Sequence, residues 1–469
     1  MKRLAQIFST ALFLTAAAAA EPHRLAVDFS ATNGQLRALH GINNGPLAAN
    51  GLVVVTEAQK RLHLPFTRLH DCHFPNPDVV DIHTIFPNPD ADPAKPSNYD
   101  FRTTDEYLAA VRATGAEIVF RLGESIEHGA VKRHVNPPRD LQRWAAVCAG
   151  IVRHYNEGWA GGYRYGIRYW EIWNEPENRP VMWTGTDAQF LELYAVTART
   201  LRAEFPEIKI GGAAFGYYGK FDGKTLVPSE FVAAFLHLCR RESLPLDFFS
   251  WHCYTADPAE LSARARAVRR LLDEGGFLKT ESHLNEWNYL PGGSWDIVSR
   301  TVTPEARQRA YEQMMGAKGG AFLAVSLIEL QDAPVEVCNF FHGETGLFGL
   351  FTEVGAPTRN FYAMLAFAQL LETPLRLRVE GGIPGSLAIA AGTNPDQTKA
   401  AMLIANLSGP DEVRLVLGKP PWPGGSEIEV FVVDEVRALE PSAVPPGSEI
   451  TLHLPPPSVA IVTLRPLKK

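Results

Sequence analysis

Cysteine is scarce in this chain, and the few that occur are not arranged as metal ligands or as a disulfide framework. The five cysteines are Cys72, Cys148, Cys239, Cys253 and Cys338. None of them stands in Cys-x-x-Cys spacing, and their odd number leaves at least one thiol unpaired within a single chain. The sequence therefore disfavours a zinc-ribbon or disulfide-stapled protein, and we expect buried free thiols.

The chain also lacks an excess of positive charge and a long apolar segment. Its formal net charge is −7, whereas a protein that binds nucleic acid needs a basic face. Beyond residue 20, no stretch is apolar over the roughly 20 residues that span a bilayer. We therefore expect neither a nucleic-acid partner nor a membrane anchor.

The amino terminus has the pattern of a secretory signal. Lys2 and Arg3 are followed by a mostly apolar stretch over residues 5–16, and small residues at 17–20 precede Glu21 and Pro22. This pattern predicts a signal peptide over residues 1–20, cleaved after Ala20. The mature protein is then exported and is periplasmic or secreted.

The first stretch with chemical meaning covers residues 169–178, Tyr-Trp-Glu-Ile-Trp-Asn-Glu-Pro-Glu-Asn. Its aromatic and β-branched residues favour a strand, and Pro176 ends the strand because it has no N–H to donate. Glu175 then stands at the carboxyl end of a buried strand. A carboxyl in that place is hydrogen-bonded or protonated, and a protonated one is a general acid. The alternative is a glutamate that caps a helix or pairs with an arginine.

A second stretch has the same design. Residues 277–288 again resemble a strand that ends in a carboxylate, Glu286, between Asn285 and Trp287. Two strand-end glutamates with aromatic neighbours suit glycoside hydrolysis, in which one carboxyl protonates the leaving oxygen and the other attacks the anomeric carbon. Aromatic side chains nearby would stack on sugar rings.

At these residues the sequence resembles glycoside hydrolase family 39, the family of β-xylosidases and α-L-iduronidases, within the clan of retaining (β/α)8-barrel glycosidases. The resemblance implies that Glu175 is the acid/base and Glu286 the nucleophile. It implies an oligo- or polysaccharide substrate, and no metal or organic cofactor. The residues expected to bind substrate or orient the glutamates are Arg68, His70, Asn174, His252, Tyr254, Trp287, Asp332 and Glu336.

Individual roles follow from the same resemblance. Arg68, in the motif Arg-Leu-His, is expected to pair with the nucleophile and lower its pKa. Asn174 is expected to bind the 2-hydroxyl of the sugar. Tyr254 would contact the nucleophile while His252 sets the polarity of the site. Asp332 replaces part of an acidic pair that follows the eighth strand in the β-xylosidases, and this departure leaves xylose specificity open.

Eight strand-like segments alternate with helical ones, which indicates a parallel sheet with crossover helices. The segments expected to be strands are residues 36–46, 66–71, 117–123, 167–176, 208–213, 246–254, 277–288 and 321–330. Closure of eight such units predicts an α/β fold, a (β/α)8 TIM barrel over residues 36–372, with its active site at the carboxyl ends of the strands. The chain of 469 residues exceeds the roughly 250 of a bare barrel.

The remaining sequence predicts an accessory domain. From about residue 375, short alternating strands are separated by Gly and Pro turns, which indicates an antiparallel β-sandwich over residues 373–469. Residues 21–35 also alternate and are expected to add an amino-terminal strand to it. In the resembled family such a domain packs beside the barrel.

Two loops remain ambiguous from the sequence. Residues 71–100 contain His73, Asp78, Asp81, His83 and Asp92, which suggests either a metal site or, more simply, a loop that shapes the mouth of the barrel. A second group after the third strand, Arg121, Glu124, Glu127 and His128, suggests either a part of the substrate pocket or a surface salt network.

The preferred hypothesis is an exo-acting β-xylosidase-like enzyme. Within the same class, an arabinopyranosidase, a uronidase or an endo-acting exopolysaccharide hydrolase remains open. From a different class, a barrel that binds glycans without cleaving them remains open as well. The sequence carries no sign of the oligomeric state.

Overall fold

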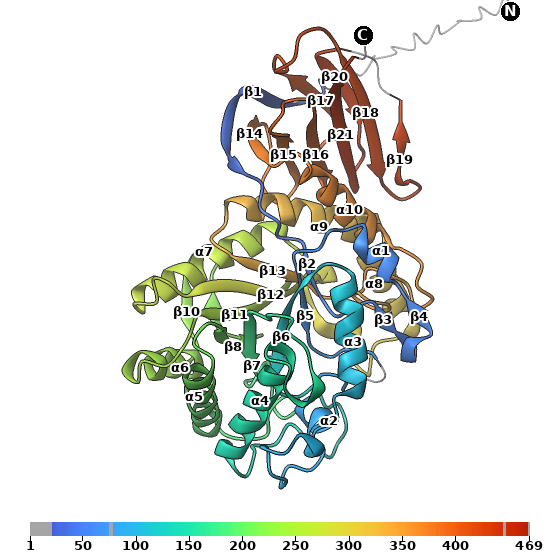
Figure 1. Ribbon diagram of the computed structural model, residues 1–469. Helices are drawn as coiled ribbons and strands as arrows, with labels where there is room; N and C mark the ends of the chain where they lie inside the picture. The colour runs from blue at the N-terminus through green and yellow to red at the C-terminus, as the bar shows by residue number, and fades with distance from the viewer. Residues whose placement is uncertain (1–20, 75–77, 444–446, 468–469) are drawn as a thin grey trace, which may run out of the picture.

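The computed structural model describes residues 21–74, 78–443 and 447–467, which form a closed parallel barrel beneath a large sheet (Figure 1). The expected signal peptide lies outside these residues. Within them, every helix is too short or too polar to cross a membrane.

The barrel has eight strands, as the sequence predicted, and each pairs in parallel with its neighbours. In chain order the strands are β2 (Gly41–Asn43), β5 (Phe66–Leu69), β6 (Glu117–Leu122), β7 (Tyr169–Ile172), β8 (Lys209–Phe215), β11 (Phe248–Thr255), β12 (Glu281–Tyr289) and β13 (Val337–Phe340).

Helices surround the barrel (Figure 1). The long ones are α3 (Arg102–Ala113), α4 (Leu141–Asn156), α5 (Asp187–Glu204), α6 (Glu230–Arg241), α7 (Pro258–Glu274), α8 (Pro304–Met315), α9 (Ala317–Glu329) and α10 (Arg359–Leu370), with short α1 (Thr56–Lys60) and α2 (Ile82–Ile85) before them. Two small hairpins, β3 (Leu47–Ala48) with β4 (Val53–Val54) and β9 (Gly219–Phe221) with β10 (Leu226–Pro228), decorate the connections.

The interior of the barrel changes from apolar to polar along the strands. Near the amino ends, Val119, Tyr169, Phe248 and Val337 form an apolar tier with Phe66 against it. Side chains on a strand alternate between its two faces, so the next interior tier lies two residues further on. That tier is polar and buried, and consists of Arg68, Arg121, Glu171, Ser250, Asn285 and Asn339. Polar side chains are thus held where the strands end.

The sequence placed the eighth strand wrongly. Residues 321–330 belong to helix α9, and the eighth strand is β13. Helix α9 is buried on every side: eleven of its residues between Ala317 and Ile328 are buried. A short apolar run of this kind has no polar face, so its periodicity cannot separate a buried helix from a buried strand.

The carboxyl-terminal strands form one nine-stranded sheet with the amino-terminal strand β1 (His23–Gln35). The others are β14 (Leu375–Glu380), β15 (Leu387–Thr393), β16 (Ala400–Asn406), β17 (Glu412–Leu417), β18 (Ser426–Val433), β19 (Ala438–Ser442), β20 (Glu449–His453) and β21 (Ser458–Pro466). β1 pairs antiparallel with β14 and parallel with β17. Strands from both halves of the sheet share one apolar cluster, so the sheet curls over its own core as a sandwich does.

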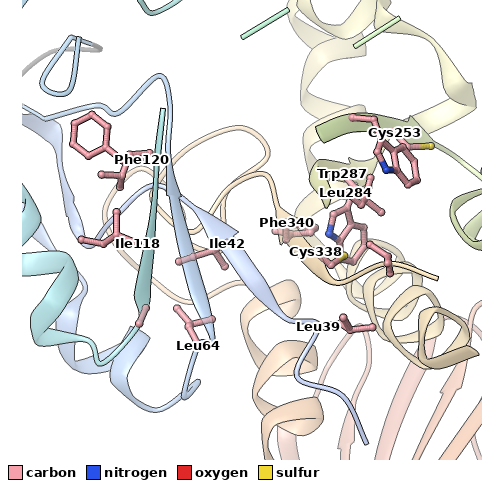
Figure 2. Packing of buried hydrophobic residues seen from close by; sticks show 14 of the residues in the cluster. Leu39, Ile42, Leu64, Ile118, Phe120, Cys253, Leu284, Trp287, Cys338 and Phe340 are labelled. Atoms are coloured by element: carbon pink, nitrogen blue, oxygen red, sulfur yellow. The ribbon is translucent and has the colours of Figure 1, made fainter. Parts of the chain in front are cut away.

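The central strands of this sheet are buried on both faces. Met402 and Ile404 on β16 point into the core of the sheet, whereas Ala401 and Leu403 belong to the cluster that continues into the barrel. Helices α9 and α10 fill the space between sheet and barrel (Figure 1). Figure 2 shows the barrel end of the same continuous core, around Leu39, Ile42 and Phe340.

The packing of α9 can be tested with two adjacent side chains. Leu327 is fully buried, so Leu327→Ala is expected to lower the free energy of unfolding by about 2–5 kcal/mol. Ser326 is equally buried, but its hydroxyl has no hydrogen-bond partner among the described residues, so Ser326→Ala should change stability by less than about 1 kcal/mol. Urea unfolding followed by tryptophan fluorescence measures both, and equal effects would contradict the packing of α9.

Candidate active site

Glu175 and Glu286 meet at the carboxyl end of the barrel. Glu175 lies three residues beyond β7, and Glu286 lies on β12, the fourth and seventh strands of the barrel. A carboxylate oxygen of each and a ring nitrogen of His252 all lie within 4.8 Å of one another. Both carboxyls are thus positioned to act on one small group between them.

An irregularity in β12 points Glu286 inward. Trp251 on β11 pairs with Leu284, but the next residue, His252, pairs with Glu286, so β12 contains one extra residue at Asn285. A β-bulge of this kind changes which residues face the barrel interior. As a result both residues have partners inside the barrel. Asn285 donates to Glu171, and Glu286 accepts from Arg68.

The same bulge turns Trp287 away from the site, so its predicted role in substrate binding is wrong. Trp287 is fully buried, with its ring edge-on to Phe340 at 5.3 Å and tilted against Phe322. Figure 2 shows it among Leu284, Cys338 and Phe340 in the apolar core. Without the bulge, strand alternation would have put Trp287 inside the barrel.

Arg68 connects β5 to β7 and β12, the strands that carry the two glutamates. Its Nη1 donates to Oε1 of Glu286 at 2.7 Å, and its Nε donates to Oε2 of Glu171 at 2.7 Å. Nη2 donates to Oδ1 of Asn174, again at 2.7 Å. The guanidinium is fully buried, and a charge taken out of water needs partners of this kind. Burial works against the charged form, but the two carboxylates outweigh it and raise the pKa of Arg68.

Tyr254 and His252 on β11 hold the two glutamates from the other side. The hydroxyl of Tyr254 donates to Oε2 of Glu286 at 2.8 Å. Nδ1 of His252 lies 2.8 Å from Oε1 of Glu175 and 3.4 Å from Oε2 of Glu286. The structure therefore brings together Arg68, Asn174, His252 and Tyr254 around the two glutamates, as the sequence predicted.

Glu175 and His252 form a hydrogen-bonded pair whose pKa values shift in opposite directions. Burial on its own would raise the pKa of Glu175, but hydrogen bonds from His252 and Asn178 hold that pKa below its ordinary value. Burial likewise opposes a charged His252, yet the carboxylates of Glu286 and Glu175 raise its pKa. The free site therefore favours an imidazolium facing a carboxylate across 2.8 Å.

His70 lies next to this network, but its imidazole differs from that of His252 in charge. It is buried, its Nε2 is 3.4 Å from Oδ1 of Asp71, and burial together with the charges of Arg121 and Arg68 lowers its pKa well below the ordinary value. His70 is thus neutral and packs beneath the mouth.

Asp332 and Glu336 lie at the opposite end of the barrel, so their predicted contact with substrate is wrong. Oε2 of Glu336 accepts from the backbone N–H of Ser282, at the amino end of β12. Both oxygens of Asp332 pair with Arg376 of the upper sheet, at 2.6 and 2.7 Å. The error follows from the eighth strand: both residues precede β13, whereas residues at the mouth have to follow it.

Sequence reasoning missed three side chains in the mouth. Glu171 is fully buried and accepts from Arg68 and from Asn285 at 2.6 Å. The sequence could have indicated Glu171, because it stands two residues after Tyr169 and therefore on the same inner face of the strand. Asn43 accepts from Arg68 at 3.0 Å. Glu344, four residues beyond β13, accepts from Asn44 at 2.8 Å and lies 2.9 Å from Nδ1 of His73.

The two ambiguous loops contain clusters that resemble metal sites in composition. Asp81, His83 and Glu124 have donor atoms within 4.8 Å of one another, as do His73, His342 and Glu344. In the first cluster Asp81 pairs with Arg121 at 2.6 Å and Glu124 with His83 at 2.5 Å, so protein cations already balance the acids. In the second, Oε2 of Glu344 and Nδ1 of His342 are buried without a hydrogen-bond partner among the described residues.

Glu127, by contrast, serves its own loop. Its carboxylate accepts from the backbone N–H groups of Arg133 and His134, at 2.8 and 3.2 Å. The five cysteines are all buried and free.

The structure is thus a closed (β/α)8 barrel with Glu175 beyond its fourth strand and Glu286 on its seventh, and Arg68 joins Glu286 to Glu171 of the fourth strand. The family model of glycosyl hydrolases family 39 matches residues 78–276. Over these residues the chain is similar to glycosyl hydrolases family 39.

Two curated relatives are β-xylosidases. The one from Geobacillus stearothermophilus is 28% identical over 270 residues, 51% of this chain and 48% of the relative. The one from Caldicellulosiruptor saccharolyticus is 22% identical over 339 residues, 65% of this chain and 59% of the relative. The chain thus matches only about half of the length of the first.

Solved structures extend the likeness over the whole fold. A glucosidase from Croceicoccus marinus superposes with a TM-score of 0.80 at 25% identity, covering 95% of this chain and 100% of that one. A monomeric β-xylosidase from Caulobacter crescentus gives a TM-score of 0.71 at 16% identity, over 95% and 100% of the two chains. At that identity the second likeness concerns the fold alone.

Asp71 makes the stability of the mouth depend on pH. Burial raises its pKa to about 7, whereas the unfolded value is near 3.8. Because the folded form then binds more protons than the unfolded form between about pH 4 and pH 7, stability falls as the pH rises through that window. Asp71→Asn keeps an acceptor for the N–H of Ile126 and tolerates the φ of +50°.

Relative to wild type, Asp71→Asn should therefore gain about 3–4 kcal/mol between pH 4 and pH 8. Urea unfolding at both pH values measures the gain. Asp222→Asn is the control, because backbone hydrogen bonds from Thr225 and Lys224 lower the pKa of that exposed carboxyl, so this variant should gain nothing. A gain that is equal at the two pH values would contradict the assignment.

Proposed function

We propose that this protein is a retaining glycoside hydrolase that acts by double displacement. The observation that carries the proposal is the pair of strand-end glutamates, one oxygen of each lying within 4.8 Å of an oxygen of the other. Retaining enzymes hold their carboxyls about 5–5.5 Å apart, whereas inverting enzymes need about 6.5–9.5 Å to admit a water. The partners of the two glutamates also differ: Glu286 is bound by Arg68 and Glu175 by His252. This difference indicates which glutamate is the nucleophile and which the acid/base.

In the first step Glu286 is the nucleophile. Arg68 and Tyr254 hold its two oxygens and keep it aimed at the anomeric carbon. As its oxygen bonds to that carbon, the bond to the leaving oxygen breaks, and Glu175 delivers a proton to that oxygen. The proton comes from the pair with His252, by transfer across the 2.8 Å hydrogen bond.

In the second step Glu175 acts as base. It takes a proton from water, the water oxygen bonds to the anomeric carbon, and the bond from Glu286 to the sugar breaks. The glycosyl-enzyme has lost the charge of Glu286, so His252 faces fewer carboxylates and Glu175 is free to accept the proton. Asn174, held by Arg68 at 2.7 Å, is in place to bind the 2-hydroxyl.

Exo action is supported by a loop that crosses the mouth. The segment after β12 includes the short turns Pro291–Gly293 and Trp295–Val298. The ring of Trp295 lies 4.7 Å from that of Tyr254, and Arg300 donates to the carbonyl of His128, after β6, at 3.5 Å. Because β6 and β12 are four strands apart in an eight-stranded barrel, this segment joins opposite sides. Such a crossing favours a closed pocket over an open cleft.

A neutral terminal sugar is supported by the charges around the pocket. Besides the two catalytic glutamates, Asp71 and Glu344 place carboxyls at the mouth, and Arg68 is fully used by protein acceptors. A uronate would therefore meet negative charge. Glu344, with His73 and the Nδ1 of His342 that has no hydrogen-bond partner among the described residues, offers polar atoms for the far hydroxyls of the sugar.

A terminal β-D-xyloside is the first candidate substrate, because the curated relatives are β-xylosidases. A β-glucoside is the second, because the structure with a TM-score of 0.80 is that of a glucosidase. The predicted signal peptide makes an exported enzyme, periplasmic or secreted, part of the same proposal.

Hydrolysis of a panel of nitrophenyl glycosides tests the function. The panel holds β-xyloside, β-glucoside, β-galactoside, both α-L-arabinosides and a uronide, and we expect activity on one neutral member. Glu286→Ala should abolish it. Glu175→Ala should lower kcat/KM by about 10²–10⁴-fold on substrates with poor leaving groups, because they depend on the proton.

Added azide distinguishes the two roles. With Glu175→Ala, azide should attack the glycosyl-enzyme and give a glycosyl azide of retained configuration, whereas with Glu286→Ala the configuration should be inverted. The reverse pattern would contradict the roles. Inactivity of the wild type on the whole panel and on the matching oligosaccharides would favour a glycan-binding barrel.

Glu344→Gln tests the polar end of the pocket. Loss of the carboxylate should raise KM by about 10-fold, the worth of one hydrogen bond to a charged group, and urea unfolding measures separately the stability lost with the His73 ion pair. Glu336→Gln is the matched control at the other end of the barrel and should leave KM unchanged. A change in KM for Glu336→Gln alone would restore the role expected from the sequence.

A further inference from the structure

Glu175 lies on one side of the site and the polar end of the sugar pocket on the other. This difference locates the leaving group. Glu175 delivers its proton to the leaving oxygen, so the leaving group has to lie beside Glu175. Glu175 extends from the end of β7, next to the end of β8. The polar end of the sugar pocket, with His342 and Glu344, follows β13 on the other side of Glu286.

The chain after β8 runs directly against the acid/base. A Cβ atom at Gly216 would lie 2.2 Å from Oε1 of Glu175, so only glycine leaves room for the carboxyl there. The backbone N–H of Glu175 also donates to the carbonyls of Ala213 and Ala214, at 3.2 and 3.1 Å. Since consecutive Cα atoms are about 3.8 Å apart, the next residue, Tyr217, begins within one residue's length of this contact.

Tyr217 is an exposed aromatic residue on an anchored backbone. Its side chain is 55% exposed, while its backbone N–H donates to Oε1 of Glu177 at 2.8 Å. The neighbouring Tyr218 is buried and packs edge-on against Trp251 at 5.6 Å. The backbone is thus fixed on both sides of a ring that is left to solvent, an arrangement suited to stacking on an apolar sugar face.

Glu177 anchors Tyr217 without adding charge next to Glu175. Burial, together with the neighbouring charge of Glu175, raises the pKa of Glu177 to about 8, so its carboxyl is protonated at neutral pH. Its Oε2 is buried without a hydrogen-bond partner among the described residues. A neutral carboxyl there accepts from Tyr217 and leaves the hydrogen-bonded pair of Glu175 and His252 undisturbed.

We propose that Tyr217, held by Glu177, is the stacking platform of a leaving-group subsite, so that the enzyme selects substrates whose leaving group is itself a sugar ring. The inference rests on the proposed function and specifies its substrate class as an oligosaccharide. Asn178, which donates to Oε2 of Glu175 at 2.9 Å, borders the same subsite from the end of β7.

Two substrates with the same terminal sugar test this subsite. Xylobiose fills it with a sugar ring, whereas β-xylosyl fluoride leaves it empty; cellobiose and β-glucosyl fluoride replace them if the enzyme is specific for glucose. The measured quantity is the ratio of kcat/KM on the disaccharide to kcat/KM on the fluoride. Loss of one stacking contact should lower this ratio about 10-fold or more in Tyr217→Ala.

Further variants separate stacking from general disruption. Tyr217→Phe keeps the ring and should restore the ratio. Glu177→Ala should lower the ratio as Tyr217→Ala does, whereas Glu177→Gln, which is neutral and still accepts from the N–H, should keep it. Trp295→Ala removes an aromatic residue on the other side of the site and should leave the ratio unchanged whatever its effect on the two rates. Val227→Ala, on β10 and 61% exposed, should change neither rate.

A ratio in Tyr217→Ala within two-fold of wild type overturns the subsite while leaving the glycosidase intact. A ratio lowered equally by Tyr217→Ala and Tyr217→Phe also overturns it, because the ring would then not be the cause. Inactivity of the wild type on both the fluoride and the disaccharide overturns the proposed function itself, and the subsite with it.

Discussion

The active end of this barrel depends on one buried cation. Arg68 is fully inaccessible, and its three nitrogens bond Glu286, Glu171 and Asn174 at 2.7 Å. Removing one partner from a buried ion pair costs about 3–5 kcal/mol, because the remaining charge is left without compensation. The two carboxylates therefore need Arg68, and Arg68 needs both of them. This mutual dependence fixes β5, β7 and β12 relative to one another at the level where the chemistry takes place.

The tiers of the barrel show how such a charge is kept in place. An apolar tier around Tyr169 and Phe248 closes the amino end and excludes water. Two residues further on, Arg68, Glu171 and Asn285 satisfy one another, and beyond them lie the reactive groups. Each tier follows from the two-residue period of a strand. The reactive side chains thus rest on a satisfied polar layer, which in turn rests on a packed apolar one.

Much of this arrangement could be predicted from the sequence, and the failures have identifiable causes. Local motifs predicted the strand-end glutamates, Arg68, His252 and Tyr254. A motif can do so because its residues are close in the chain and lie together at the end of one strand. Trp287 failed because one extra residue at Asn285 reverses the alternation, and a bulge leaves no local signal. The eighth strand failed because α9 is apolar on every side. That error moved the search for sugar-binding acids to Asp332 and Glu336, so Glu344 was missed.

The contrast between the two candidate catalytic glutamates comes from their partners and not from their burial. Both lie at strand ends, and both are mostly withdrawn from solvent. Glu286 is held by Arg68, whose charge is permanent, and by the hydroxyl of Tyr254, partners that suit the proposed nucleophile. Glu175 is held by a histidine, the side chain whose proton moves most readily near neutral pH. In the proposed mechanism the carboxyl of Glu175 acts as acid and base in turn, because its histidine partner can donate a proton to it and accept one from it.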